Sequence, residues 1–315
     1  MLNPHRRAVP SIAILMTLAL LAAACGSDGS DGSSATDGNT TSTTEEGGAT
    51  TTEASGSTTV ARWADNVTIE IGDDTFRYIS DGLPSHELPD QFLVPNEGNM
   101  PPFEGDDVAA AFNIQNTEDL IVESPVDVEI TLNPVYSEEI TPTSLSTIGV
   151  IISGAQLFND YEDMGLEFVA LDDNLSLDGV GFIDACNGHP LASGDSYHYH
   201  GVPYCITDDV DVEGQHSTIL GMLIDGFPVY GPQDEGGVIV TNEDLDECSG
   251  HEGPTPEFPD GIYHYHLTED AAPYSIDCFH GVVDATSTDT AGGPPDGAGP
   301  PDGAGPPAAA AEANG

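Results

Sequence analysis

The chain has 315 residues and a formal net charge of −51, because 55 acidic residues face only four arginines and no lysine. A surface of this charge repels nucleic acid and anionic lipid head groups, and it is typical of a protein kept soluble in a salty exterior. We therefore expect no nucleic-acid partner. The sequence also has no GxSxG motif, no phosphate-cradling glycine loop and no basic aromatic patch, which argues against common hydrolases and nucleotide enzymes.

The first 25 residues have the pattern of an export signal. Arg6 and Arg7 give a charged start, an apolar run follows over residues 12–21, and three alanines precede Cys25. A cysteine at that place resembles the bacterial lipoprotein signal, in which the cysteine is lipidated and becomes the new N-terminus. We expect a lipid anchor at Cys25 that holds the protein on the outer face of a bacterial membrane; a plain secretory signal is the alternative.

Both ends of the chain have compositions that predict disorder. Residues 26–60 are almost entirely Ser, Thr, Gly, Ala and acidic residues, so they cannot bury enough apolar surface to fold and predict a flexible tether. Residues 285–315 form a Pro, Gly and Ala tail in which the sequence PPDGAG occurs twice. Between them, residues 61–284 contain enough apolar side chains for one sizeable core, and we expect a single domain there.

The periodic segments of this domain are β-like. Apolar residues alternate over 67–71, a Gly-Asp-Asp turn follows, and 76–79 returns as a hairpin; residues 126–132 alternate as well. No helical periodicity extends beyond about three turns. The predicted fold class is all-β or β-rich, as a sandwich or barrel of short strands with long loops.

Much of the domain is an internal duplication. Two short hairpins, at 149–158 and 221–230, each lead into the same order of motifs: C-x-G-H, then YHYH, then PY and a cysteine. We name residues 149–205 copy 1 and residues 221–278 copy 2. The spacers differ in length while the motifs keep their order, as expected when loops vary around a fixed frame.

Four cysteines remain once Cys25 is set aside, an even number that suits an oxidising compartment. Because equivalent cysteines flank each YHYH motif, we predict the disulfides Cys186–Cys205 and Cys248–Cys278. A pairing between the copies is the alternative.

The YHYH motifs place histidines at alternate positions. On an extended strand residues i and i+2 share a face, so His198 and His200 point one way while Tyr197 and Tyr199 point the other way. Two imidazoles can then converge on one metal ion while the tyrosines pack into the core. The second motif repeats this arrangement with His264 and His266 on one face and Tyr263 and Tyr265 on the other.

Two imidazoles do not make a tight site, so further ligands are needed. His189 and His251 are the first candidates, since each follows a C-x-G motif; the remaining candidates are His216, His280, His86, Asp195, Asp225 and Asp260. Imidazole and carboxylate donors suit zinc or copper, which are the predicted cofactors. Each copy could hold its own ion, or the two histidine pairs could meet at a pseudo-twofold axis. The alternative is that the histidines are hydrogen-bonded parts of the fold, or acid-base and pH-sensing groups.

The chain resembles the YHYH-domain family, on the motifs at 197–200 and 263–266 and on three further segments, FRYISDGLP (76–84), ITLNP (130–134) and DGFPVYGP (225–232). The resemblance extends over residues 66–283, which implies that the N-terminal hairpin belongs to the same domain. It also implies a site role for His86, with Asp225 in support, and cysteines that stabilise rather than react.

Three functional hypotheses follow. The first is a surface lipoprotein that binds a transition metal through its duplicated histidines. The second is a metal-dependent hydrolase or oxidoreductase, whose base would be Asp225, Asp195 or Glu252. The third is a non-catalytic recognition or adhesion module with structural histidines. No substrate is indicated by the sequence.

Overall fold

The structure, a computed structural model, describes residues 62–96 and 108–283. The expected signal segment, Cys25, the tether and the tail lie outside these residues. The described part is rich in short strands, which confirms the β-rich fold class. Its strands form several separate sheets, and within the described residues none closes into a barrel.

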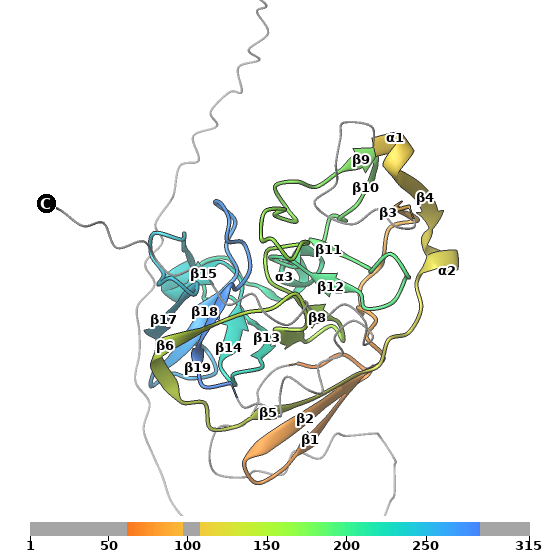
Figure 1. Cartoon of the computed structure of the whole chain (residues 1–315). Helices are drawn as coiled ribbons and strands as arrows, with labels where there is room; N and C mark the ends of the chain where they lie inside the picture. Colours follow the sequence, from red (N-terminus) through yellow and green to blue (C-terminus); the bar gives the residue numbers. More distant parts are fainter. Residues whose placement is uncertain (1–61, 97–107, 284–315) are drawn as a thin grey trace, which may run out of the picture. The chain divides into compact units, whose positions relative to one another are not determined.

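The largest sheet has eight strands in the order β11-β12-β8-β7-β13-β14-β18-β17. In Figure 1 this order leads from the green strands β11 and β12 to the blue strands β17 and β18. Copy 1 supplies four of the strands: β7 (Gly149–Ile151), β8 (Gln156–Leu157), β11 (Gly188–His189) and β12 (His198–Tyr199). Copy 2, with the two residues before it, supplies the other four: β13 (Ile219–Leu223), β14 (Pro228–Tyr230), β17 (Gly250–Gly253) and β18 (Ile262–His266).

The strand order of this sheet is symmetric about a pseudo-twofold axis between β7 and β13. These two strands pair antiparallel, and Val150 lies opposite Met222, which is its equivalent in the other copy. Moving outward, β8 and β12 pair in parallel in copy 1, as β14 and β18 do in copy 2. The two YHYH strands are therefore five strand spacings apart, or roughly 24 Å.

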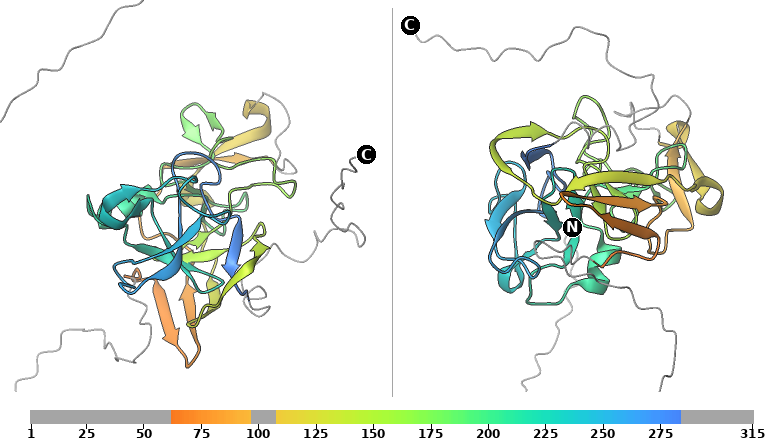
Figure 2. Two further views of the ribbon diagram at one scale, coloured as in Figure 1. Left: turned by 90° about the vertical axis from the view of Figure 1, so that its left-hand side faces the viewer. Right: turned by 90° about the horizontal axis from the view of Figure 1, so that it is seen from below.

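The remaining strands form small sheets around the duplicated unit. A three-stranded sheet contains β1 (Val67–Ile71), β2 (Thr75–Ser80) and β5 (Val126–Thr131). The pairs are β3 (Gln91–Pro95) with β4 (Phe112–Asn116), β6 (Tyr136–Pro142) with β19 (Cys278–Gly281), β9 (Ser176–Leu177) with β10 (Val180–Gly181), and β15 (Gln233–Asp234) with β16 (Val238–Ile239). The helical segments are short: α1 (Val108–Ala111), α2 (Thr117–Leu120), α3 (Tyr204–Val210) and the 3-10 turn Glu235–Gly237. Figure 2 shows the same elements from two further sides.

The N-terminal hairpin packs on the duplicated unit. The strand β2 places Phe76 and Tyr78 in the main core, and the Tyr78 hydroxyl donates a hydrogen bond to the Ile151 carbonyl oxygen at 3.1 Å. A second, smaller core gathers around Leu93, Phe112 and Phe182. None of the helices among the described residues has the length and apolar character needed to cross a membrane.

The element bounds follow the sequence patterns closely. The alternating segments at 67–71, 76–79 and 126–132 are the strands β1, β2 and β5, and the two hairpins of the duplication are β7–β8 and β13–β14. Both predicted disulfides, Cys186–Cys205 and Cys248–Cys278, are present in the structure.

Candidate metal centres

Each copy, with the residues just before it, holds a cluster of mostly buried histidines with one carboxylate. Cluster 1 contains Glu162, His189, His198 and His200. Cluster 2 contains His216, Asp234, His251, His264 and His266. The strands that pair beside each YHYH motif create these clusters, because β11 places His189 opposite His198 and β17 places His251 opposite His264. The histidine pairs do not meet at the pseudo-twofold axis, so each copy has a cluster of its own.

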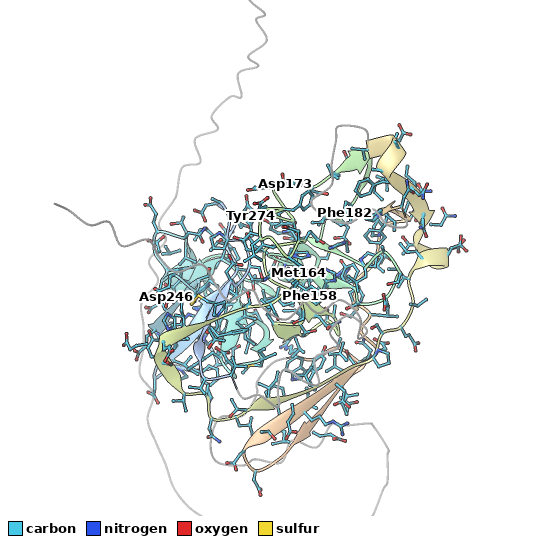
Figure 3. The ribbon with its side chains drawn as sticks, in the orientation of Figure 1. Phe158, Met164, Asp173, Phe182, Asp246 and Tyr274 are labelled. Atoms are coloured by element: carbon cyan, nitrogen blue, oxygen red, sulfur yellow. A yellow bond between two sulfur atoms is a disulfide. The ribbon has the colours of Figure 1, made fainter. Side chains whose placement is uncertain are left out.

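In cluster 1 the Nε2 atoms and the carboxylate converge on one point. The Nε2 atoms of His189 and His200 are 3.2 Å apart. One oxygen of Glu162, Oε1, lies 2.7 Å from the first and 2.9 Å from the second. This oxygen is buried and has no hydrogen-bond partner of good geometry. The Phe158 ring, labelled in Figure 3, stacks on the third imidazole, His198, at a centroid distance of 3.9 Å.

Cluster 2 repeats the convergence. The Nε2 atom of His251 lies 3.1 Å from that of His264 and 3.2 Å from that of His266. The Oδ1 atom of Asp234 is 4.0 Å from His251 Nε2 and 3.7 Å from the Nε2 atom of His216. That nitrogen of His216 is buried without a hydrogen-bond partner and faces the cluster.

The opposite ring nitrogens fix the histidines. In cluster 1, Nδ1 of His198 donates to the Ser196 carbonyl oxygen and Nδ1 of His200 to that of Asn159, both at 2.6 Å. A buried Nδ1–H of this kind sets the tautomer, so Nε2 of a neutral ring carries a lone pair directed into the cluster.

Cluster 2 has the same second layer of contacts. The Nδ1 atoms of its imidazoles donate to backbone carbonyl oxygens of Ile262, Gly231 and Ser217, for His264, His266 and His216 respectively. Ile262 and Gly231 stand at the positions of copy 2 that correspond to Ser196 and Asn159. The duplication therefore preserves the orientation of the imidazoles and not only their identity.

The surroundings shift the pKa values of the titratable groups differently in the two clusters. Burial alone would raise the pKa of Glu162, but the imidazoles of His189 and His200 outweigh it and hold that pKa well below its usual range. Burial lowers the pKa of His200, yet the adjacent Glu162 carboxylate reverses this and the net shift is upward. Cluster 1 thus pairs the Glu162 carboxylate, which ionises readily, with the His200 imidazole, which accepts a proton readily. In cluster 2, burial lowers the pKa of His264 to about 4 and places that of His266 well below its ordinary value.

The clusters also differ in access to solvent. In cluster 1 the side chains of His189 and Glu162 are 2% and 11% exposed, so the site is closed. In cluster 2 the side chains of His251 and Asp234 are each 25% exposed. One edge of cluster 2 therefore reaches solvent, while cluster 1 is sealed inside the fold.

The tyrosines of the YHYH motifs lie on the other face, as the alternation predicts. The Tyr197 hydroxyl donates to Asp184 and the Tyr263 hydroxyl to Asp246, at 2.8 and 2.9 Å. Tyr265 donates to Asp225 at 2.6 Å, and Tyr199 contacts Ser153 at 3.0 Å. The predicted supporting residue Asp225 is thus a buried partner of Tyr265 and is not a member of either cluster.

The structure does not bring His86 to either cluster. Its Nε2 atom is 2.8 Å from the Tyr199 hydroxyl, and its Nδ1 atom is 3.1 Å from the Glu87 carbonyl oxygen. The ring lies on the tyrosine face beside the Cys186–Cys205 disulfide, whose sulfur atoms are bonded to each other and offer no thiolate. Asp195, Asp260 and Glu252 do not belong to the clusters either.

Sequence reasoning missed the two carboxylates, although a signal was present. Glu162 and Asp234 both stand eight residues after the second glycine of their hairpin, Gly154 or Gly226. An alignment of the copies carried past the hairpins pairs these two acidic residues. His216 has no such counterpart, because the equivalent position in copy 1 is Ser144.

The fold and these sites define a class of protein: a strand-rich domain with a duplicated motif and two largely buried histidine–carboxylate clusters. The model of the YHYH protein family matches residues 127–236 and 233–281. Over this stretch the chain belongs to the YHYH family, as its motifs predict. No curated protein and no solved structure matches the chain.

Proposed function

We propose that the YHYH domain of this chain binds two transition-metal ions, one in each cluster. The observation that carries the proposal is the convergence of imidazole Nε2 atoms in each cluster, where the Nδ1–H groups of the YHYH histidines His198, His200, His264 and His266 are already held by backbone carbonyls. Around a tetrahedral zinc ion with Zn–N bonds of about 2.0–2.1 Å, neighbouring nitrogens are about 3.3–3.4 Å apart. The Nε2 separations of 3.1–3.2 Å in the two clusters are close to that spacing.

Hydrogen bonding among the imidazoles is the competing explanation, and it accounts for less. His251 Nε2 lies near two other Nε2 atoms, yet a neutral ring has one N–H to give. With the Nδ1 atoms of His264 and His266 donating to the backbone, at least one pair of lone pairs would face each other inside the fold. A bound cation would interact favourably with all of these lone pairs at once.

Three imidazoles with a carboxylate in cluster 1, and four imidazoles with a carboxylate in cluster 2, favour zinc, with copper as the alternative. A closed set of four protein donors is typical of a structural ion, which is the role we assign to cluster 1. The partly exposed edge of cluster 2 gives an ion a route to the exterior, so we assign this cluster to an ion that exchanges slowly, over times longer than a desalting step. We further infer that the domain is displayed on the outer face of a bacterial membrane through a lipid at Cys25. The two disulfides support an oxidising compartment for this arrangement.

The test is metal content by mass spectrometry after loading with zinc or, in a parallel sample, with copper, and passage over a desalting column. The parent chain should retain two ions. The double variants His189→Gln/His200→Gln and His251→Gln/His266→Gln should each retain one. The matched control is His86→Gln, which replaces a histidine outside the clusters and should leave both ions in place.

Near-ultraviolet circular dichroism shows whether each variant is folded. A folded parent that retains neither zinc nor copper would overturn the proposal and favour structural histidines in a recognition module. Copper retained in place of zinc would keep the sites and change the metal, and would direct assays toward redox chemistry.

A further inference from the structure

A histidine outside both clusters has an unsatisfied nitrogen. His280 in β19 is 3% exposed, and its Nδ1 atom donates to the Ser137 carbonyl oxygen at 2.7 Å. Its Nε2 atom is buried and has no hydrogen-bond partner. That nitrogen faces Asp246, whose Oδ2 atom is 3.6 Å away.

This arrangement calls for a cation. With Nδ1–H engaged by the backbone, Nε2 of a neutral ring presents a lone pair to a carboxylate, and the two repel. Glu247 adds a second carboxylate, and one donor atom from each of the three residues lies within 4.8 Å of the others. The unpartnered buried nitrogen therefore points into an acidic pair and not into solvent.

Asp246 is held rigidly for such a role. Its Oδ1 atom accepts hydrogen bonds from the backbone N–H groups of Cys248 and Gly250, at 2.9 and 3.0 Å. The Tyr263 hydroxyl donates to its Oδ2 atom. The Cys248–Cys278 disulfide then ties this turn to β19, since the two cysteines stand two residues after Asp246 and two residues before His280. The covalent link keeps the carboxylates and the imidazole together.

Of the three residues, Asp246 lines a pocket of about 620 Å³, whose wall also includes Tyr136, Glu138 and Glu252. Tyr136 stacks on the His280 ring at a centroid distance of 4.9 Å and is itself partly exposed. The carboxylate of Asp246, which is labelled in Figure 3, is 25% exposed on its side chain. An ion held here would keep coordination positions open toward the pocket.

We propose that His280, Asp246 and Glu247 form a third cation site, independent of the two clusters, for a divalent transition metal such as Zn²⁺ or Mn²⁺. One imidazole with two carboxylates is a donor set that these ions accept. Three protein ligands leave room for water or for an oxygen of a small molecule in the pocket, as in open metal sites.

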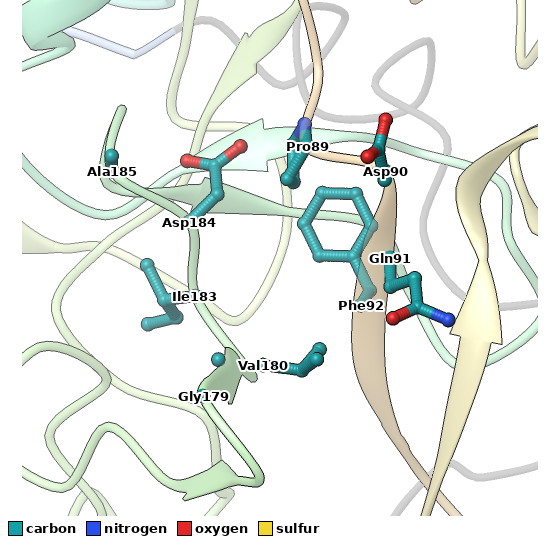
Figure 4. A pocket seen from close by; sticks show the side chains of 10 residues that line it. Pro89, Asp90, Gln91, Phe92, Gly179, Val180, Ile183, Asp184 and Ala185 are labelled. Carbon is teal, nitrogen blue, oxygen red and sulfur yellow. The ribbon is translucent and has the colours of Figure 1, made fainter.

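Copy 1 supplies an internal comparison. The residue equivalent to Asp246 is Asp184, and it lines a pocket of about 390 Å³ with Phe92, as Figure 4 shows. The position of Glu247 is taken by Ala185, also on the wall of that pocket. The histidine on the tyrosine face is His86, and both of its ring nitrogens have partners. Copy 1 therefore has a pocket beside the equivalent aspartate without the donor set, and we expect no cation site of this third kind there.

The experiment is equilibrium dialysis of the full chain against Zn²⁺, followed by metal analysis without a desalting step. The parent should bind one ion more than it retains after desalting. Glu247→Gln should weaken the binding of this extra ion by about tenfold or more, a loss of affinity typical of disturbed metal sites. His280→Gln should abolish it. The matched control is Glu252→Gln, an exposed carboxylate on the same pocket, which should bind as the parent does.

The ions that survive desalting report the clusters, so the two proposals fail separately. If the parent binds no ion at dialysis beyond those retained after desalting, the third site is overturned whatever the clusters do. It is equally overturned if Glu247→Gln, an exposed change that leaves the core intact, binds the extra ion as tightly as Glu252→Gln. Loss of the cluster ions with the extra ion kept would refute the proposed function alone.

Discussion

The metal-free protein should lose stability in acid through His264. Burial lowers the pKa of this ring to about 4 in the folded protein, whereas an unfolded histidine titrates near its ordinary value of about 6.5. The unfolded state therefore takes up the proton first as the pH falls. The contribution of the neutral ring to stability is complete above about pH 6.5 and is lost progressively as the pH falls toward 4.

The size of the loss follows from the two pKa values. Integrating proton uptake from about pH 6.5 to 4 gives a decrease of about 3 kcal/mol in the free energy of unfolding, from this one ring. The variant His264→Gln has no such proton to take up. The difference in stability between pH 7.5 and pH 4 should therefore be about 3 kcal/mol smaller in the variant than in the parent.

The assay is urea denaturation of both proteins in the presence of a chelator, at the two pH values. Comparing the two differences removes any general effect of the substitution, and it removes the titration of groups that both proteins share. A double difference below about 1 kcal/mol would refute the reasoning, because it would mean that His264 is hydrated or already paired in the folded protein.

Three further outcomes are expected. Gly250→Ala should lower the free energy of unfolding, measured by denaturation, by about 2–3 kcal/mol, because a new Cβ would lie 2.5 Å from Cζ of the Tyr263 ring. Gly253→Ala on the same strand meets only ordinary contacts and serves as the control. Burial raises the pKa of Asp225 to about 6, so its ionisation opposes folding. As the pH rises from about 4 to 7, the free energy of unfolding of the parent should fall by about 3 kcal/mol relative to that of Asp225→Asn. Parallel pH profiles of stability in the two proteins would contradict this. Glu162→Gln should weaken zinc in cluster 1 by at least about tenfold in competition with a chelator, and an unchanged affinity would remove this carboxylate from the ligand set.

The sequence was sufficient for the features that depend on local periodicity. Alternation on a strand places His198 with His200 and Tyr197 with Tyr199 on opposite faces, and the structure has this arrangement. Ordered motifs that occur twice were enough to pair the four cysteines correctly. These inferences need only the geometry of a strand and the assumption that equivalent segments fold alike.

The carboxylates could not be chosen in the same way. With 55 acidic residues in the chain, composition gives Glu162 and Asp234 no special place, and only the offset from the hairpin glycines distinguishes them. His86 shows the opposite difficulty, because a histidine can join a domain through a tyrosine hydroxyl as well as through a metal site. Which face it reaches depends on long-range packing of the segment after β2, and periodicity does not encode that.

The duplication also indicates how the two clusters relate to the fold. The donors of cluster 1, from Glu162 to His200, all lie within copy 1, and those of cluster 2 lie in copy 2 or, for His216, just before it. What the copies share is the pairing of β7 with β13, where Gly149 and Gly221 allow the backbones to approach closely. Each cluster is thus contained in one copy and its immediate flank, whereas a single copy is incomplete as a sheet, since its β7 or β13 edge would be left unpaired. Each cluster is therefore built locally while stability is common to both copies, so the two clusters can differ in exposure within one frame that orients their imidazoles.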